Sequence, residues 1–492
     1  FWLKPFWFEQ QTILSYRCLP LMGISFGQAR TTLVRVTIGL LLRGCVDVAL
    51  AVDCGGWLCS ASNADNPLPD SALRRSGELG DYCDIAIADA DSHGMDWSDK
   101  PFVVRGGGDL LSKDPFSQKS LLNIARNKNW RAKWGTSDSI TANVGEGPKN
   151  SHMEEFITDI MRKPRYDPTT DERLESPYVF QRFPGKNFKL PPVLQWLDWV
   201  DCFFGLGAEG SGVSWHRHNA AAQISVYGWK RWFLLPPELP PAGGGLGFWS
   251  ILEWLMVVLP KVEGATRPLE CMVGPSDIIY VPESWYHAVF NVGGDSVSVS
   301  LQAASGSVTE NRKLFDEYVK ERNTLQQITL LQRILQLYPN DTDTLTMLAN
   351  LYLKSGDHHS ALNIFNDIVL KDPFNINAMY EIFSMVADER RATQKEDSSK
   401  EDKTKAARKL LNTLRAFEPL LANNTNRSLM ANYMLAVLYR VTKNAATEID
   451  KLSRNADLQN SGTWFGKGLP QHNFSKMLVR ARHRISQIAD EL

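Results

Sequence analysis

The pattern of hydrophobic and polar positions changes along the chain near residue 306. Residues 80–305 carry short apolar runs separated by Gly and Pro, such as 278–281, and a strictly alternating run at 296–301. Alternation with a period of two is typical of a half-buried strand, and short strands between such turns suit a small barrel or jelly roll. From residue 308 to 492 Gly and Pro thin out and a helical period takes over. The pattern predicts an α+β multidomain chain, in which a β-rich domain precedes an all-α domain.

The helical half contains a repeat of 34 residues, measured between Pro339 and Pro373. The small and apolar residues of this repeat are Leu348, Ala349, Tyr352, Gly356, Ala361, Phe365 and Ile368. Their spacing resembles the tetratricopeptide pattern, in which small residues let two antiparallel helices approach each other. Residues 407–419 and 434–439 match the pattern in part, and the charged run 389–405 indicates a solvated loop. A generic helical bundle is the alternative.

Composition narrows the class of protein. The chain has 492 residues, of which 43% are hydrophobic and 22% charged, so it is globular and extensive disorder is excluded. Its net charge of −1 argues against binding nucleic acid through a bulk positive field. The seven Cys include no Cys-x-x-Cys pair, which excludes zinc-finger and thioredoxin motifs. Cys202 and Cys271 lie on candidate strands, where buried thiols and a disulfide are both open.

The two ends of the chain and its sequons bear on location. Residues 1–75 read as a poorly structured leader, either a degraded secretory signal or a misannotated segment. Their longest uncharged apolar run is far too short to span a bilayer, so no membrane span is expected. The last four residues, Ala489-Asp490-Glu491-Leu492, resemble an endoplasmic reticulum retrieval signal. Sequons for glycosylation stand at Asn340, Asn423, Asn426 and Asn473. Together these features predict a glycoprotein of the endoplasmic reticulum lumen.

Three histidines form the candidate metal site. His216 and His218 are two positions apart, so on a strand both point to the same face. His287 follows the run 278–281 and a turn with Pro, at the start of a further strand. Histidines from two such non-adjacent strands are suitable metal ligands. His358 and His359 lack this context, and we treat them as ordinary.

Other residues in this region have structural interpretations. Lys230 stands in an otherwise apolar strand, where a lysine must be paired or reach solvent. Asp277 opens a strand from a turn, so we predict a turn residue rather than a ligand. Four tryptophans are predicted to belong to the barrel core, namely Trp215, Trp229, Trp232 and Trp285.

Two strings of residues resemble the JmjC domain family, a double-stranded β-helix of the cupin class. They are Gly-Trp-Lys-Arg-Trp-Phe-Leu-Leu-Pro-Pro at 228–237 and Val-Pro-Glu-Ser-Trp-Tyr-His-Ala-Val-Phe-Asn at 281–291. The resemblance covers residues 80–305. It implies a dioxygenase that uses iron(II) and 2-oxoglutarate and acts on protein side chains. It also implies that His216 and His287 bind the metal, that Lys230 pairs with the far carboxylate of 2-oxoglutarate, and that Asn291 supports this cosubstrate.

One position departs from the family's pattern, because His218 stands where Asp or Glu is expected. Three neutral imidazoles suit zinc as well as iron. An active iron site, a zinc or structural site, and an inactive fold are therefore all open. The sequence predicts a protein hydroxylase of the secretory pathway with a helical tail that binds protein partners. The alternative is a catalytically inactive scaffold or regulatory interaction protein.

Overall fold

The structure is a computed structural model of the whole chain. It describes residues 54–58, 82–88, 100–109, 111–142, 147–163, 166–167, 172–173, 175–183, 191, 194, 199–245, 249–303, 310–387, 451 and 454. The loop predicted at 389–405, the partial repeats at 407–419 and 434–439, and three of the sequons lie outside these residues. Most of the predicted leader and the last four residues of the chain lie outside them as well.

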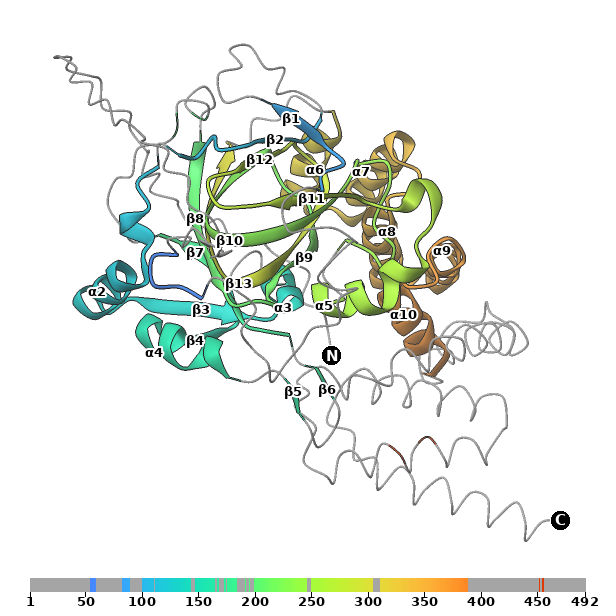
Figure 1. Cartoon of the computed structure of the whole chain (residues 1–492). Coiled ribbons are helices and arrows are strands. Elements are labelled where there is room, and N and C mark those ends of the chain that lie inside the picture. Colours follow the sequence, from blue (N-terminus) through green and yellow to red (C-terminus); the bar gives the residue numbers. More distant parts are fainter. Residues whose placement is uncertain are drawn as a thin grey trace, which may run out of the picture.

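An 11-stranded sheet forms the first part of the molecule (Figure 1). Its strands are β1 (Ala86–Ala88), β2 (Phe102–Val104), β3 (Arg131–Gly135), β4 (Lys149–His152), β7 (Tyr178–Arg182), β8 (Trp199–Gly207), β9 (Gly212–His216), β10 (Ala221–Leu235), β11 (Leu269–Val273), β12 (Ile278–Val281) and β13 (Tyr286–Ala303). The order is β1-β2-β12-β10-β13-β8-β7-β3-β4, with β11 added to β10 and β9 added to β13. A separate pair joins β5 (Tyr166–Asp167) to β6 (Glu172–Arg173). The predicted strands at 278–281 and 296–301 are confirmed.

Two long strands, β10 and β13, pair along their length and belong to two half-sheets. One end of β10 pairs with β12 and the other with β11, while β13 pairs with β8 at one end and β9 at the other. The register between β10 and β13 shifts on both sides of Tyr227, where Gly228 has φ of +73°. Opposite this point, Gly293 and Gly294 also have positive φ. Such bulges bend strands, so the sheet folds back on itself as the predicted double-stranded β-helix.

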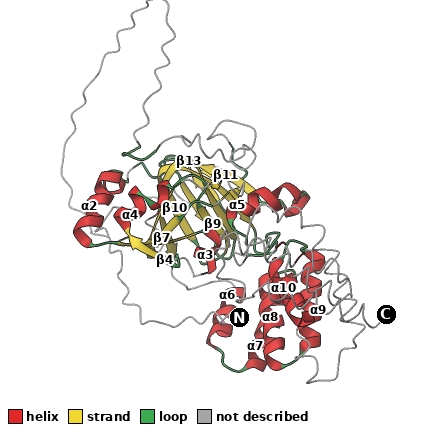
Figure 2. Ribbon diagram, turned by 90° about the horizontal axis from the view of Figure 1, so that it is seen from below, coloured by secondary structure: helices red, strands yellow, loops and turns green. Residues whose placement is uncertain are grey.

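Helices lie on two opposite sides of the sheet (Figures 1 and 2). The α-helices are α2 (Gln118–Lys128), α3 (Ser137–Ala142), α4 (Met153–Thr158), α5 (Ile251–Glu253), α6 (Glu310–Lys320), α7 (Thr324–Leu337), α8 (Thr342–Ser355), α9 (His358–Lys371) and α10 (Ile376–Ala387). Buried side chains of α2 and α4, such as Leu121 and Phe156, join the core of one sheet face. Helices α6–α10 gather on the other side. None of the described helices is long and apolar enough to cross a membrane.

The predicted repeat is the helix pair α8–α9. Asp341 caps the first helix, whose backbone turns at Gly356 with φ of +85°, and Asp357 caps the second. Ala349, Ala361 and Phe365 are fully buried, as expected where two helices approach closely. Helix α8 also buries Leu348 against α6 and α7. Helices therefore follow the sheet in the order that the sequence predicts.

Cys202 and Cys271, for which buried thiols and a disulfide were both open, differ from each other in their bonding. Cys271 on β11 forms a disulfide with Cys83, which is 188 residues earlier in the chain. Cys202 on β8 is not part of this disulfide. A disulfide that joins distant segments removes conformational freedom from the unfolded chain and stabilises the fold. Here it attaches the segment before β1 to the edge of the barrel.

The packing of α9 predicts a contrast between two of its residues. Phe365 is 0% exposed and Leu370 is 61% exposed. Replacing a buried Phe by Ala costs about 3–5 kcal/mol, whereas a surface substitution stays within about 0.5 kcal/mol. We expect Phe365→Ala to lower the thermal midpoint of the helical unit clearly, and Leu370→Ala to leave it unchanged, when unfolding is followed by circular dichroism. Equal midpoints for the two variants would contradict this packing.

Candidate metal centre

The strands β9 and β13 bring two of the three histidines face to face. His216 is the last residue of β9 and His287 is the second residue of β13, and the two are direct partners in the antiparallel register. The two strands are not adjacent along the chain, as predicted, but they are hydrogen-bonded neighbours in the sheet. Directly opposed side chains on such a pair lie on one face of the sheet. The register alone places both imidazoles together.

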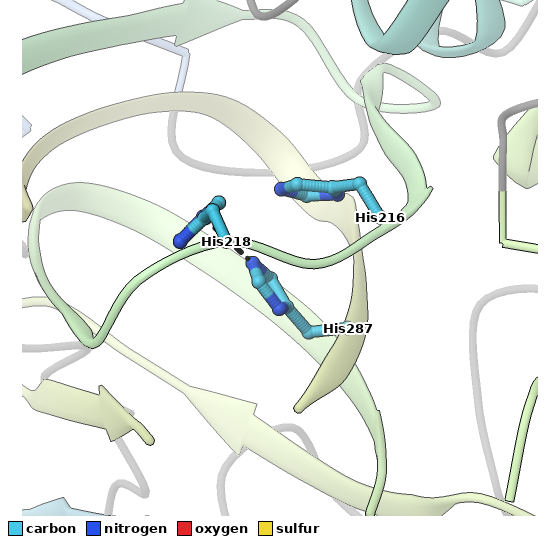
Figure 3. Close-up of side chains that lie close together, drawn as sticks. All are labelled: His216, His218 and His287. Atoms are coloured by element: carbon cyan, nitrogen blue, oxygen red, sulfur yellow. Dashed lines mark hydrogen bonds between the residues drawn. The ribbon is translucent and has the colours of Figure 1, made fainter. Parts of the chain in front are cut away.

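His218 reaches the same point from a loop. Strand β9 ends at His216 and β10 begins at Ala221, so the prediction that both early histidines share a strand is wrong for His218. The loop nevertheless directs its ring to the other two (Figure 3). Ring centroids lie 4.1 Å apart for His216 and His287, and 4.6 Å apart for His218 and His287. The three predicted ligands are thus brought together.

The ligand atoms of the three rings all lie within 4.8 Å of one another. The Nε2 atoms of His218 and His287 are 3.1 Å apart. Protein nitrogen ligands bind iron or zinc at distances near 2.0–2.2 Å. Nitrogens with these separations can therefore bind one cation between them.

Hydrogen bonds to the backbone fix the tautomer of each ring. The Nδ1 atoms of His216, His218 and His287 lie 2.7, 2.6 and 3.0 Å from the carbonyl oxygens of Ser214, Asn219 and Trp285. A carbonyl oxygen only accepts, so each Nδ1 carries the proton and donates it. Each neutral ring then presents the lone pair of Nε2 to the common point. The Nε2 atoms of His218 and His287 lie 3.1 Å apart, the contact that is dashed in Figure 3, and a bound cation would accept a lone pair from each.

Two of the rings, those of His216 and His287, are held in the neutral form. Burial lowers the pKa of His216 to about 3, with a further contribution from neighbouring His218. Burial also places the pKa of His287 well below its ordinary value, and the other two rings lower it further. Neutral imidazole is the form that binds metals. No carboxylate belongs to the group in the described part of the chain, so the site offers three nitrogens and no negative charge.

Lys230 lies on the same face of the β10–β13 pair as His287. It faces Asn291 across the ladder, and Leu234 faces His287, with no irregularity between the two positions. Asn291 is four residues after His287, about 13 Å along the strand. Lys230 Nζ donates to Asn291 Oδ1 at 2.6 Å and to the Tyr178 hydroxyl at 3.3 Å. The predicted cosubstrate residues therefore meet each other on the metal-bearing face.

The sequence predicts that Lys230 is either paired or solvated, and it is paired through hydrogen bonds to neutral groups. The side chain is 0% exposed, and its hydrogen-bond partners, a phenol and an amide, are neutral. Burial lowers the pKa of Lys230 to about 7. A buried ammonium without a counter-charge is costly, and an anion beside it would offset the cost. The lysine thus forms a buried cationic site for a carboxylate.

Two contacts around Lys230 were not predicted from the sequence, one to the lysine itself and one to its partner Asn291. Tyr178 comes from β7, and Ser211 Oγ accepts from Asn291 Nδ2 at 2.8 Å. Tyr178 lies outside the strings that carry the family resemblance, and only the strand order brings it to Lys230. Asp277 accepts from Gly106, Gly274 and Arg105, which agrees with its predicted turn role. Of the four tryptophans, Trp215 and Trp232 are buried and the other two are half-buried.

Comparisons with known proteins agree with both halves of the fold. The tetratricopeptide repeat family matches residues 326–381. JmjC domain-containing protein 8 of the mouse is 36% identical over 103 residues, which are 21% of this chain and 38% of that protein. Lysine-specific demethylase JMJ21 of Arabidopsis thaliana is 28% identical, over 37% of this chain and 23% of its own length. The zebrafish protein named 2-oxoglutarate and iron-dependent oxygenase JMJD4 is 22% identical over 198 residues, which are 36% of this chain and 45% of that protein.

These matches confirm the resemblance to the JmjC proteins and to the tetratricopeptide repeat. The chain matches little more than a third of the mouse protein's length. Activities named for the relatives remain statements about those proteins.

The converging Nε2 atoms predict a single cation site. We expect the purified protein to bind about one equivalent of iron(II) or cobalt(II), measured by metal analysis after dialysis. The double variant His216→Ala/His287→Ala should bind none, because one imidazole cannot hold the ion alone. The matched control His358→Ala/His359→Ala removes two histidines of α9 and should bind as the unaltered protein does. Equal metal content in all three proteins would disprove the site.

Proposed function

We propose that this chain is an oxygenase that uses iron(II) and 2-oxoglutarate and acts on protein side chains. One observation carries the proposal: a three-nitrogen site and a buried, uncompensated lysine lie on one face of the same strand pair. A metal cation fits the first and a carboxylate fits the second. A dicarboxylate bound between them satisfies both. The JmjC relatives, one of them named for iron and 2-oxoglutarate, support this assignment.

The chain's own residues hold and orient these groups. His216, His218 and His287 would hold the iron, and their Nδ1 hydrogen bonds keep the rings in the orientation that binding needs. Three protein ligands leave further coordination positions for small molecules. Lys230 would form a charge-assisted hydrogen bond with the far carboxylate of 2-oxoglutarate. The hydrogen bond that Lys230 donates to Asn291 holds the lysine side chain in position. When bound, iron(II) and 2-oxoglutarate would supply the chemistry that activates oxygen.

Buried side chains with large apolar surfaces line the path between the two sites. Trp232 and Val289 stand between Lys230 and His287 on the paired strands, and both are buried. The Trp232 ring lies nearly parallel to that of His287, with centroids 6.1 Å apart. In such surroundings electrostatic interactions are stronger than in water. The pairing of Lys230 with a carboxylate therefore adds more to binding than the same pair would at the surface.

His218 is the residue on which the alternative function rests. A set of three imidazoles lacks the negative charge of a site with two histidines and a carboxylate, and loss of that charge is one way in which an oxygenase fold becomes an inactive scaffold. The named relatives do not favour this alternative. They offer no support for zinc in place of iron either. The neutral set also leaves the full charge of the ion available to a dianionic cosubstrate.

We also propose that the protein works in the secretory pathway and binds protein partners through its helical repeats. The disulfide between Cys83 and Cys271 supports an oxidising compartment. The sequon residue Asn340 is exposed in the turn before α8, where an oligosaccharide has room. Repeats of this kind present extended surfaces to other proteins. A protein substrate could thus be held by the same chain that modifies it.

Lys230 gives the sharpest test of the cosubstrate. Losing a buried charge pair of this kind costs about 2–5 kcal/mol. We therefore expect Lys230→Ala to weaken binding of 2-oxoglutarate to the iron-loaded protein at least about tenfold, measured by anaerobic calorimetry. Lys230→Arg keeps a charge that does not titrate. Binding by Lys230→Ala as tight as by the unaltered protein would exclude the assigned role.

The same pair predicts a dependence on pH. Only the ammonium form pairs with a carboxylate, and burial lowers the pKa of Lys230 to about 7. As pH rises above 7 the free protein loses this proton, so affinity should fall by up to about tenfold per pH unit. Lys230→Arg stays charged and should show a flat profile from pH 7 to 9. Parallel profiles for the two proteins would show that another group controls binding.

Location can be tested on protein taken from its own cells. We expect Cys83 and Cys271 to resist alkylation until a reductant is added, while Cys202 reacts once the protein is denatured. A mass shift removed by endoglycosidase H should shrink in Asn340→Gln. Full alkylation of all three cysteines without reductant, together with no glycan, would place the protein in a reducing compartment.

A further inference from the structure

We propose that Asp341, a residue of the helical repeat unit, is a positioning residue for the three-histidine centre and acts through Arg217 and Tyr286. The inference rests on the proposed metal binding. Under this inference the helical unit, formed by α6–α10, contributes to the geometry of the metal site.

The chain order places both intermediaries beside the ligands. Arg217 stands between His216 and His218, and Tyr286 directly precedes His287. Arg217 Nη2 donates to Asp341 Oδ2 at 2.7 Å, and the Tyr286 hydroxyl donates to Asp341 Oδ1 at 3.1 Å. A single carboxylate therefore connects to the backbone neighbours of all three histidines.

The three side chains also contact one another away from water. The Arg217 guanidinium lies over the Tyr286 ring, 4.8 Å from its centroid. The Asp341 side chain is 0% exposed and that of Arg217 is 19% exposed. Charge-assisted hydrogen bonds in such a setting are strong and directional. Asp341 therefore determines where both Arg217 and Tyr286 lie.

His218 depends most on this support. His216 and His287 are held by the ladder between β9 and β13, whereas His218 lies in a loop outside that ladder. Its own carbonyl accepts from the backbone of Ser284 at 2.9 Å. The loop is also joined to β13 through Ala220, whose carbonyl accepts from Ala303, and the Arg217–Asp341 pair fixes its other end. Removing the pair would loosen the position of the third ligand relative to the other two.

The carboxylate itself is held firmly by the helical unit. Asp341 caps α8, where it accepts from the backbone of Asp343 and Thr344 at 3.2 Å each and from the Thr344 hydroxyl at 2.8 Å. Its geometry therefore follows the helix. Any displacement of α8 would move the carboxylate to which Arg217 and Tyr286 are bonded.

Further contacts fix α8 against the barrel. Asp343 Oδ1 accepts from Gly245 at 3.2 Å, and both oxygens of Asp372 accept from Gly243. The Trp249 indole donates to the Phe374 carbonyl at 3.0 Å. These bonds join the loop between β10 and α5 to three points of the helical unit. The unit and the metal-bearing strands thus form one connected body.

Asp341→Asn is the decisive variant. Asn caps helices as well as Asp does, so α8 keeps its cap while the charge that holds Arg217 is lost. Residues that orient metal ligands typically contribute 10–100-fold to metal affinity. We expect cobalt(II) to bind at least about tenfold more weakly, with shifted visible absorption bands, in a titration of the whole protein. The matched control Asp357→Asn changes the cap of α9 and should bind cobalt(II) normally.

A second variant keeps the test independent of folding. Tyr286→Phe retains the ring and removes only the hydroxyl, so we expect a severalfold loss of cobalt(II) affinity at temperatures where circular dichroism shows the variant to be folded. If both Asp341→Asn and Tyr286→Phe bind cobalt(II) like the unaltered protein, while the His216→Ala/His287→Ala variant does not, the inference fails and the metal site stands. If the unaltered protein binds no cobalt(II), the proposed function fails first and takes the inference with it.

Discussion

The hydrogen-bond register of β13 is the constraint on which the rest of the site depends. It sets His287 opposite His216 on one neighbour and Asn291 opposite Lys230 on the other. A slip of one residue would turn every one of these side chains to the opposite face. The positive-φ glycines and bulges at the middle of the strand pair fix where the sheet bends. Backbone pairing therefore positions the chemistry before any ligand is present.

The three imidazoles and Lys230 favour ligands of opposite charge, and they lie on the same face of the strand pair. The three imidazoles direct nitrogens to one point, and Lys230 is buried with neutral hydrogen-bond partners among the described residues. Each arrangement alone costs the fold some free energy. A cation and an anion bound together would offset both. Proteins commonly accept such costs at functional sites, where local stability is exchanged for a prepared binding geometry.

Much of this could be read from the sequence, and the exceptions have physical causes. The alternating run ending at Leu301, the repeat around Ala349 and the three histidines were all predicted, because each leaves a local or periodic pattern. The loop position of His218, the Cys83–Cys271 bond and the Tyr178 contact were not. These depend on which distant strands become neighbours, and that is decided by tertiary pairing. The Arg217–Asp341 pair, which spans 124 residues, left no local signal for the same reason.

The central claim is that three neutral histidines and one buried lysine make a working centre for 2-oxoglutarate chemistry. The most direct test is formation of succinate from 2-oxoglutarate by the iron(II)-loaded protein in air, measured beside His218→Asp and His216→Ala/His287→Ala. The account predicts succinate from the unaltered protein above the level of the double variant. Succinate from His218→Asp alone, with none from the unaltered protein, would contradict it and show that the third histidine has turned the fold into a scaffold.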